Sequence, residues 1–274
     1  MGKKLSDAQV AQFREQGFLY PVDALSVAQA AAYLKKFEDA EALHGREIGR
    51  NFNSKPHLLF PWADEIIRHP AVLDAVEDIL GPNIRMLHVT IWPKRAHDPA
   101  YVSWHQDGTY FGLERPAQVT AWVALSDASV EAGCMEVITG SHKLGQLHHG
   151  EEVSSNNLLS KGQTIDVEFE RGNAVRMPVR AGQFSLHHPD LIHSSPANNA
   201  DHRRVGVGAV YISTDVRCTS SVRLTSTLVR GVDTFGYFDD ERRPTTDYGP
   251  EEQAQHREAI ARFRSSNQEQ AQRY

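Results

Sequence analysis

One short stretch of the chain carries two residues that could hold a metal ion. Residues 103–110 read Ser-Trp-His-Gln-Asp-Gly-Thr-Tyr, which places His105 two positions before Asp107. Aromatic and β-branched neighbours favour an extended backbone, in which these two side chains lie on the same face. His193, in the run Asp-Leu-Ile-His-Ser-Ser-Pro, is the best candidate for a third ligand. Two histidines and one carboxylate on one side of a metal leave the opposite positions open, as in the facial triad of non-haem Fe(II) oxygenases.

Two arginines follow the third candidate ligand and begin an apolar run. Residues 205–210 read Val-Gly-Val-Gly-Ala-Val, directly after Arg203 and Arg204. A strand leaving the metal would carry Arg204 back beneath it, where burial of the guanidinium requires an anionic partner. The planar fork of an arginine binds a carboxylate through two hydrogen bonds. Arg204 therefore predicts a carboxylate pocket next to the metal, whereas Arg203 is expected at the surface.

The chain has 14 histidines, so most of them must have other roles. His187 and His188 precede the third candidate ligand in a run that reads as a strand, and alternation turns one of the two into the interior. Either could contact a substrate, and His188 is the candidate that we take forward. The remaining histidines are expected to fix turns, as His142 does, or to lie in solvent, as His256 does.

Composition describes an ordinary globular protein and excludes several classes of partner. The 274 residues carry a formal net charge of −6 without a block of like charges, which argues against nucleic acid as a partner. No apolar run is long enough to cross a membrane, and the first residues lack the apolar core of a secretory signal. Only Cys134 and Cys218 occur, so a disulfide framework is excluded and the cytoplasm is the expected location. The partner is expected to be a small-molecule substrate, for a monomer or homo-oligomer.

The candidate ligands need a scaffold that brings distant segments together. We expect one domain over residues 1–274, with a helical part to about residue 83, β-structure over about 84–215, and a lid and helix over about 216–274. Short strands between Gly, Pro, Asn and Asp indicate a sandwich or jelly roll, in which early and late strands meet at one mouth. The expected helices cover 6–16, 27–43, 62–80 and 251–270, with a loop over 45–61, and the expected strands cover 86–92, 118–125, 134–138, 164–169, 174–179, 183–188 and 205–213.

Several short motifs surround the candidate ligands. They are Trp-His-Gln-Asp at 104–107, Thr-Ala-Trp-Val-Ala-Leu at 120–125, Gly-Cys-Met at 133–135, Thr-Gly-Ser-His at 139–142, His-Ser-Ser-Pro at 193–196 with the later Arg204, and Leu-Gly-Pro-Asn at 80–83. With the opening Leu-Ser-Asp-Ala-Gln-Val and Gln-Gly-Phe, this set resembles the phytanoyl-CoA dioxygenase family over about residues 5–245. The resemblance implies a mainly β fold, a double-stranded β-helix (a cupin-like jelly roll) with N-terminal and C-terminal helices.

The resemblance also implies an enzyme that uses Fe(II), 2-oxoglutarate and O2. Carried over to this chain, it makes His105, Asp107 and His193 the iron ligands. The residues implied to bind 2-oxoglutarate are Arg204 at its distal carboxylate, Ser195 beside it, Trp122 lining the pocket, and Thr90 and His88 on a neighbouring strand. The implied reaction hydroxylates an sp3 C–H bond and releases succinate and CO2. Relatives that chlorinate carry a small residue in place of the aspartate, so Asp107 argues for hydroxylation.

The substrate is expected to be a small polar or anionic molecule. Candidate residues for its pocket are Tyr110 and Phe111 after the motif, Asn51, Lys55 and His57 in the early loop, and His188. The block from Arg217 to Arg230 could close over the mouth as a lid, and basic residues there would suit an anion. The bacterial members that the chain resembles act on small free molecules, such as 2-aminoethylphosphonate-type compounds and biosynthetic intermediates, and that class is expected here.

Two other classes of function stay open at this point. A metal-dependent hydrolase or lyase on a cupin-like barrel would use the same two histidines and carboxylate to activate water, but it has no use for Arg204. A non-catalytic binding protein would keep the fold as a scaffold, because fold does not dictate function. An intact triad together with its arginine argues against the second alternative.

Overall fold

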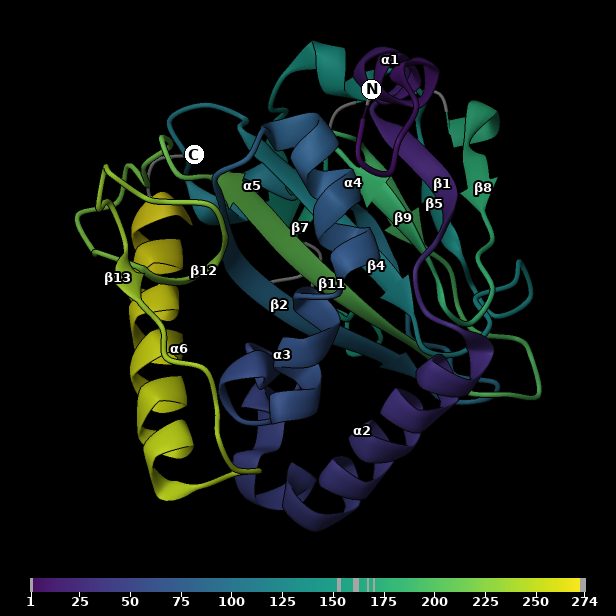
Figure 1. Cartoon of the computed structure of the whole chain (residues 1–274). Coiled ribbons are helices and arrows are strands. Elements are labelled where there is room, and N and C mark those ends of the chain that lie inside the picture. The colour runs from purple at the N-terminus through teal and green to yellow at the C-terminus, as the bar shows by residue number, and fades with distance from the viewer. Residues whose placement is uncertain (1, 152–153, 160–162, 167, 170, 272–274) are drawn as a thin grey trace.

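Two antiparallel sheets form the centre of the protein, and helices flank them (Figure 1). The computed structural model describes residues 2–151, 154–159, 163–166, 168–169 and 171–271. The helices are α1 (Asp7–Gln16), α2 (Val27–Ile48), α3 (Pro61–Ile67), α4 (Pro70–Leu80), α5 (Gly108–Phe111) and α6 (Pro250–Ala271). The strands are β1 (Phe18–Asp23), β2 (Ile84–Lys94), β3 (Val102–His105), β4 (Gln118–Ala124), β5 (Met135–Val137), β6 (His149–Glu151), β7 (Gln163–Ile165), β8 (Val175–Met177), β9 (Gln183–His187), β10 (His193–Ser195), β11 (Arg204–Ser213), β12 (Thr225–Arg230) and β13 (Asp239–Asp240).

The larger sheet has the order β1-β9-β4-β11-β2-β12-β13, and the smaller one has the order β3-β10-β5-β8. A separate pair, β6-β7, forms a third, two-stranded sheet. Neighbours in these sheets come from distant parts of the chain, as the pairing of β2 with β11 shows. This arrangement confirms the predicted mainly β jelly roll with helices at both ends. The treatment of all 274 residues as one domain stays a prediction.

Local sequence signals set the helix boundaries well at the N-terminus of the chain. Ser6 caps α1 in a capping box with Gln9, and Gly17 ends the helix with a φ of 86°, a backbone conformation that glycine adopts without strain. Residues 62–80 form two helices, α3 and α4, and each begins with a proline in its first turn. The predicted end of α2 near residue 43 is wrong, because the helix continues through Gly45 to Ile48.

The first 83 residues are not purely helical, contrary to our prediction. β1 follows α1 directly and pairs with β9 at the edge of the larger sheet, with Phe18 opposite His187. Its Phe-Leu-Tyr-Pro-Val sequence is rich in residues that favour strands. The run is short and lies between two helices, so its β pattern does not stand out in the sequence. β1 gives β9 a second hydrogen-bonded neighbour besides β4.

The two faces of the larger sheet have opposite character. On one face, alternate residues such as Val119, Ala121 and Val123 of β4 pack against α2, α3 and α4 in the largest hydrophobic cluster of the described chain. On the other face lie Thr120, Trp122 and their neighbours on the adjacent strands, which turn toward the smaller sheet. This period-2 alternation produces a helix-covered core on one side and a polar interior on the other.

The C-terminal part differs from the predicted lid. Residues 225–230 form β12, which pairs with β2 as a regular strand of the larger sheet. The final helix, α6, lies beside β12 and β13 (Figure 1). His256 on α6 was expected in solvent, but it is 4% exposed and its Nε2 donates to the backbone oxygen of Ser54 at 2.8 Å. Within the described part of the chain, no helix has the length and apolar character needed to cross a membrane.

The buried His256 predicts a loss of stability in mild acid. Burial lowers the pKa of His256 from its ordinary 6.5 to about 4. Between these values the unfolded chain binds a proton that the folded chain excludes, so stability falls as the pH falls, by up to about 1.4 kcal/mol per pH unit. His256→Gln keeps a donor for Ser54 without the titration. Guanidinium unfolding at pH 7 and pH 5 should show a smaller loss for the variant than for the wild type, and equal losses would contradict this.

Candidate metal centre

The smaller sheet brings two of the predicted ligands into direct register. His105 ends β3, His193 begins β10, and their Cα atoms are partners in the antiparallel ladder. Asp107 was expected to lie on the same strand face as His105, but β3 ends at His105 and Asp107 is the residue before the short helix α5. The turn nevertheless directs its carboxylate to the same place. One ligand atom from each of the three residues lies within 4.8 Å of the others.

The hydrogen bonds of the two histidines fix which ring nitrogen faces the aspartate. Nδ1 of His105 lies 2.9 Å from the backbone oxygen of Ser103, and Nδ1 of His193 lies 2.8 Å from that of Leu191. Because a carbonyl only accepts, each Nδ1 carries a proton, which leaves Nε2 as the ring nitrogen that could bind a metal. The two Nε2 atoms lie 3.5 and 3.7 Å from Oδ1 of Asp107. Backbone carbonyls often hold metal-binding histidines in this way.

The charge states of the three groups suit a cation. Burial would raise the pKa of Asp107, but the imidazoles of His105, His187 and His193 hold that pKa well below its ordinary value. Burial, followed by the proximity of His105, lowers the pKa of His193 well below its ordinary value. The ionised carboxylate of Asp107 and the two Nε2 atoms converge here, and together they offer a divalent cation two nitrogen ligands and one oxygen ligand. The donor set therefore fits Fe(II).

Arg204 lies beside this cluster and is 2% exposed. Its Nη1 donates to Ser195 Oγ and to the backbone oxygen of Gly133, each at 2.9 Å, and its guanidinium lies 5.2 Å from the ring centroid of Trp122. Burial lowers the pKa of Arg204 to about 10, so the group stays charged at neutral pH. The Nε of Arg204 has no partner among the described residues, and the acceptors that the rest of the guanidinium reaches are neutral oxygens. A buried guanidinium in this state is suited to bind a carboxylate.

Lys94 supports this pocket from behind and was not predicted. It is fully buried at the end of β2, and its Nζ donates to Ser195 Oγ at 2.7 Å and to the backbone oxygens of Ser195 and Pro196. Ser195 Oγ thus accepts from both Lys94 and Arg204 while donating to Gly133. Burial lowers the pKa of Lys94 to about 6. The sequence around Lys94 does not indicate this role, because a lysine at the end of a strand is usually solvated.

Glycines on β11 make room for the tryptophans that line the recess. A Cβ on Gly206 would lie 1.9 Å from the ring of Trp122, so that ring packs directly on the backbone. The recess beside Arg204 is about 60 Å³ and is lined by Trp92, Trp122 and Ser195 among others. Thr90 and His88, which the resemblance also implied at the keto acid, do not line it. They lie further along β2 and face a larger cavity.

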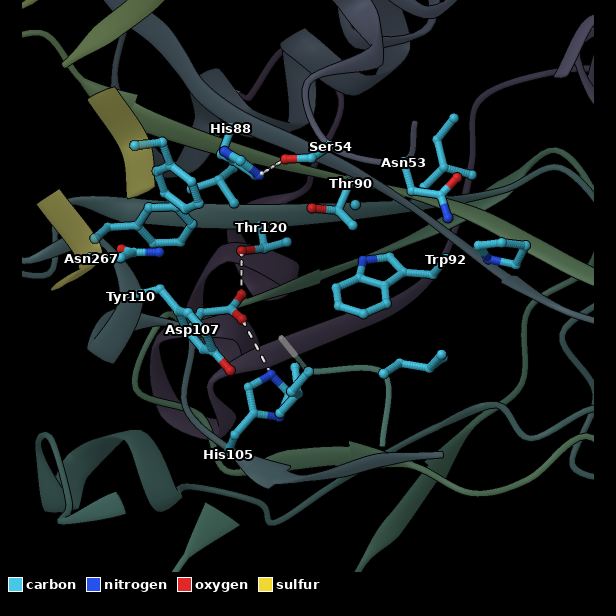
Figure 2. A pocket seen from close by; sticks show the side chains of 18 residues that line it. Asn53, Ser54, His88, Thr90, Trp92, His105, Asp107, Tyr110, Thr120 and Asn267 are labelled. Carbon is cyan, nitrogen blue, oxygen red and sulfur yellow. Dashed lines mark hydrogen bonds and ion pairs between the residues drawn. The ribbon is translucent and has the colours of Figure 1, made fainter. Parts of the chain in front are cut away.

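The larger cavity has a volume of about 330 Å³ and shares His105, Asp107, Thr120, Trp92 and Gly208 with the recess. Figure 2 shows His88 and Thr90 on one side of this cavity and the candidate metal ligands His105 and Asp107 on the other. Tyr110 and Phe111 line it, as we predicted for the substrate pocket. Further lining residues that the sequence analysis did not predict include Asn53, Ser54, Phe263 and Asn267. The last two stand four positions apart on α6, a spacing that places them on one helix face.

Three of the predicted substrate residues lie elsewhere. Lys55 and His57 are buried against Glu241, with Nε2 of His57 3.1 Å from the carboxylate and Lys55 in an ion pair with it. Asn51 accepts a hydrogen bond from Arg264 at 2.6 Å. None of the three lines the cavity among the described residues. Their polar side chains serve the attachment of the C-terminal part, and the residues between them, Asn53 and Ser54, face the cavity instead.

The strand ending at position 187 resolves the choice between two adjacent histidines. His187 faces the three candidate metal ligands, and its Nε2 lies 3.1 Å from Oδ2 of Asp107. His188 lies one residue further on and points to an outer groove beside His142, with ring centroids 4.9 Å apart. The prediction of His188 as a substrate residue is therefore wrong. Alternation in the sequence predicts that one of the two histidines turns inward. Which one does so depends on the register of the strand, and a shift of one position exchanges them.

The predicted arginine lid is not formed. Arg217 pairs with Glu114, Arg223 with Asp239, and Arg230 with Asp74 and Glu77. These ion pairs neutralise the arginines on the outside of the sheet and against α4. None of these arginines lines the cavity, among the described residues. The wall on this side comes from α6.

Comparisons with known proteins agree with this geometry. The family model described as phytanoyl-CoA dioxygenase (PhyH) matches residues 13–206. The apo structure of the non-heme monooxygenase ThoJ is 32% identical with a TM-score of 0.88, covering 97% of this chain and 100% of that one. A ThoJ–Ni complex is 30% identical with a TM-score of 0.82, covering 96% and 99%.

A curated relative from Stutzerimonas stutzeri, a probable alpha-ketoglutarate-dependent hypophosphite dioxygenase, is 29% identical over 153 residues. That match covers 54% of this chain and 52% of the relative, so the chain spans about half the length of this relative. The family model covers well over half of the chain and includes all three residues of the metal cluster and Arg204. The chain therefore belongs to the phytanoyl-CoA dioxygenase family.

Proposed function

We propose that the protein is an Fe(II)- and 2-oxoglutarate-dependent dioxygenase that hydroxylates an sp3 C–H bond of a small molecule. The observation that carries the proposal is a cluster of two histidines and one carboxylate beside a buried arginine that has no anionic partner among the described residues. When bound, the iron and 2-oxoglutarate supply the activation of O2, with succinate and CO2 as products. A hydrolase would use the cluster but not the arginine.

The chain's own residues have distinct tasks in this scheme. His105, Asp107 and His193 would hold the iron from one side. Arg204 and Ser195 would bind the distal carboxylate of the keto acid, against the ring of Trp122. The larger cavity would hold the substrate with its reactive C–H bond toward Asp107 and exclude competing molecules. The cytoplasm stays the proposed location, and the free thiols of Cys134 and Cys218 support it.

We further propose that the part of the substrate inside the cavity is uncharged. The described lining residues include no lysine or arginine, and the acid among them, Asp107, belongs to the metal cluster. Burial lowers the pKa of His88 well below its ordinary value, so this histidine is neutral too. Burying a charge without a partner is costly. This reverses the anionic preference that the sequence suggested, because the arginines behind that suggestion are paired elsewhere.

A spectroscopic titration tests the proposed activity. Under anaerobic conditions, Fe(II) and 2-oxoglutarate added to metal-free protein should produce the weak visible metal-to-ligand charge-transfer band. Succinate release should then require O2, whereas a hydrolase would stay active under nitrogen. Absence of the band in protein freed of other metals would contradict the proposal. Matched acids and their amides in the succinate assay test the charge of the substrate, and stimulation by the acids alone would contradict the uncharged class.

Arg204→Met should weaken 2-oxoglutarate binding while leaving Fe(II) binding nearly unchanged. Losing one partner of a buried charge pair costs about 2–5 kcal/mol, so the Kd of 2-oxoglutarate should rise by at least about 30-fold. The band described above gives both constants when each component is titrated in turn. Arg223→Met is the matched control, since Arg223 pairs with Asp239 at the surface. Equal keto-acid affinity in both variants would exclude Arg204 from the pocket.

A further inference from the structure

The two oxygens of Asp107 have different partners. Oδ1 faces the Nε2 atoms of His105 and His193, at 3.5 and 3.7 Å. Oδ2 lies 3.1 Å from His187 Nε2 and 2.8 Å from Thr120 Oγ1. Figure 2 shows the contact between Thr120 and Asp107. The carboxylate therefore has one oxygen directed at the metal cluster and one held by the larger sheet.

We propose that His187 is a positioning residue which, with Thr120, holds the outer oxygen of Asp107 and so keeps Asp107 a one-oxygen ligand. This inference rests on the proposed function, since it concerns the same metal. His187 and Thr120 are register partners on the neighbouring strands β9 and β4, so their side chains project side by side from the larger sheet. The smaller sheet supplies the histidine ligands, and the larger sheet orients the carboxylate.

The hydrogen-bond inventory of His187 supports this role. The residue is 2% exposed, and its Nδ1 has no partner among the described residues. An ionised Asp107 can only accept, so Nε2 of His187 must carry the proton and donate it. A buried ring nitrogen without a partner is unfavourable, so loss of the Nε2 contact would leave both ring nitrogens of His187 in that unfavourable state. Among the described residues, the contact with Asp107 is the one hydrogen bond of this side chain, so it is the interaction that gives the buried ring a polar partner.

The consequence concerns the positions left for other ligands. Two histidines and one carboxylate oxygen would occupy three of the six positions of an octahedral Fe(II). A bidentate keto acid and O2 need the remaining three. A carboxylate that turned to bind through both oxygens would take one of those positions. The hydrogen bonds from His187 and Thr120 to Oδ2 would oppose that rotation, so His187 would keep this coordination position open.

Three variants test the inference. His187→Phe fills the space without a donor, His187→Gln restores an N–H near the place of Nε2, and Thr120→Val removes the second donor. We expect His187→Phe to weaken Fe(II) binding about 10–100-fold, as second-shell losses do, with a smaller loss for Thr120→Val. His187→Gln should bind Fe(II) within a few-fold of the wild type. The d–d absorption of Co(II)-loaded protein, which depends on coordination number, should change in His187→Phe and return in His187→Gln.

The outcomes separate this inference from the proposed function. Wild-type Fe(II) affinity and an unchanged Co(II) spectrum in His187→Phe would overturn the role of His187 and leave the proposed function intact. A loss in His187→Phe that glutamine does not restore would show that the ring merely fills space, which also overturns it. If His187→Phe fails to fold, the Fe(II) affinity and Co(II) spectrum of Thr120→Val provide the test, and wild-type values for both would overturn the inference. A wild-type protein that binds no Fe(II) would instead overturn the proposed function.

Discussion

His193→Ala is expected to abolish both metal binding and the keto-acid band. The variant removes one of the two imidazoles that face Oδ1 of Asp107, and the remaining pair cannot hold Fe(II) against water. Metal analysis after anaerobic loading should fall from one ion per chain to none. Succinate release should fall to background. Because the imidazole is buried and its Nδ1 bonds to Leu191, circular dichroism must confirm that the fold survives.

His188→Ala is the matched control for that experiment. It removes a nearby histidine whose ring lies in the outer groove beside His142. Metal content and succinate release should therefore stay at the wild-type level. If His188→Ala lost the metal and His193→Ala kept it, the assignment of the ligands would be wrong.

Glu241→Ala is expected to destabilise the protein by about 3–5 kcal/mol, the usual cost of leaving a buried charge without its partner. The carboxylate is fully buried and receives hydrogen bonds from Thr225 and Thr227, each at 2.7 Å, besides its contacts with Lys55 and His57. Removing it leaves the Lys55 ammonium buried. Guanidinium unfolding measures the loss. Asp240→Ala is the matched control, because the neighbouring Asp240 pairs with Arg85 from a side chain that is 77% exposed.

The same cluster should respond to acid. Burial alone would raise the pKa of Glu241, but Lys55 and His57 lower it strongly from its ordinary 4.5. A carboxyl group with a depressed folded-state pKa contributes stability above its ordinary value and loses that contribution as the pH falls below it. The difference in unfolding free energy between wild type and Glu241→Ala should therefore shrink below about pH 4.5. A constant difference down to pH 3 would contradict this assignment of charge.

Much of the site could be predicted from sequence because its signals are local. The His-Gln-Asp spacing, the Ser-Ser-Pro after His193 and the arginine opening an apolar strand each carry chemical meaning within a few residues. Alternation along β4 also identifies Val119, Ala121 and Val123 as one face of the larger sheet, the face that the helices cover. These features indicated the jelly roll and placed the metal cluster beside Arg204.

Residues whose roles depend on distant partners could not be predicted. Lys55 and His57 look like polar loop residues until Glu241, almost two hundred positions later, is seen to lie between them. β1 is too short for its pattern to stand out between two helices. His187 and His188 differ by one position in an alternation whose register is set by pairing with β4. Long-range contacts decide each of these cases.

The direct pairing of His105 with His193 across β3 and β10 has a mechanical consequence. These strands are only four and three residues long, so few backbone hydrogen bonds join them. An ion bound by both imidazoles would link β3 to β10, and its binding energy would add to the stability of the smaller sheet. Amide hydrogen exchange around residues 102–105 and 193–195 should slow when iron is supplied. An enzyme starved of iron would then be an easier target for proteases at these two strands.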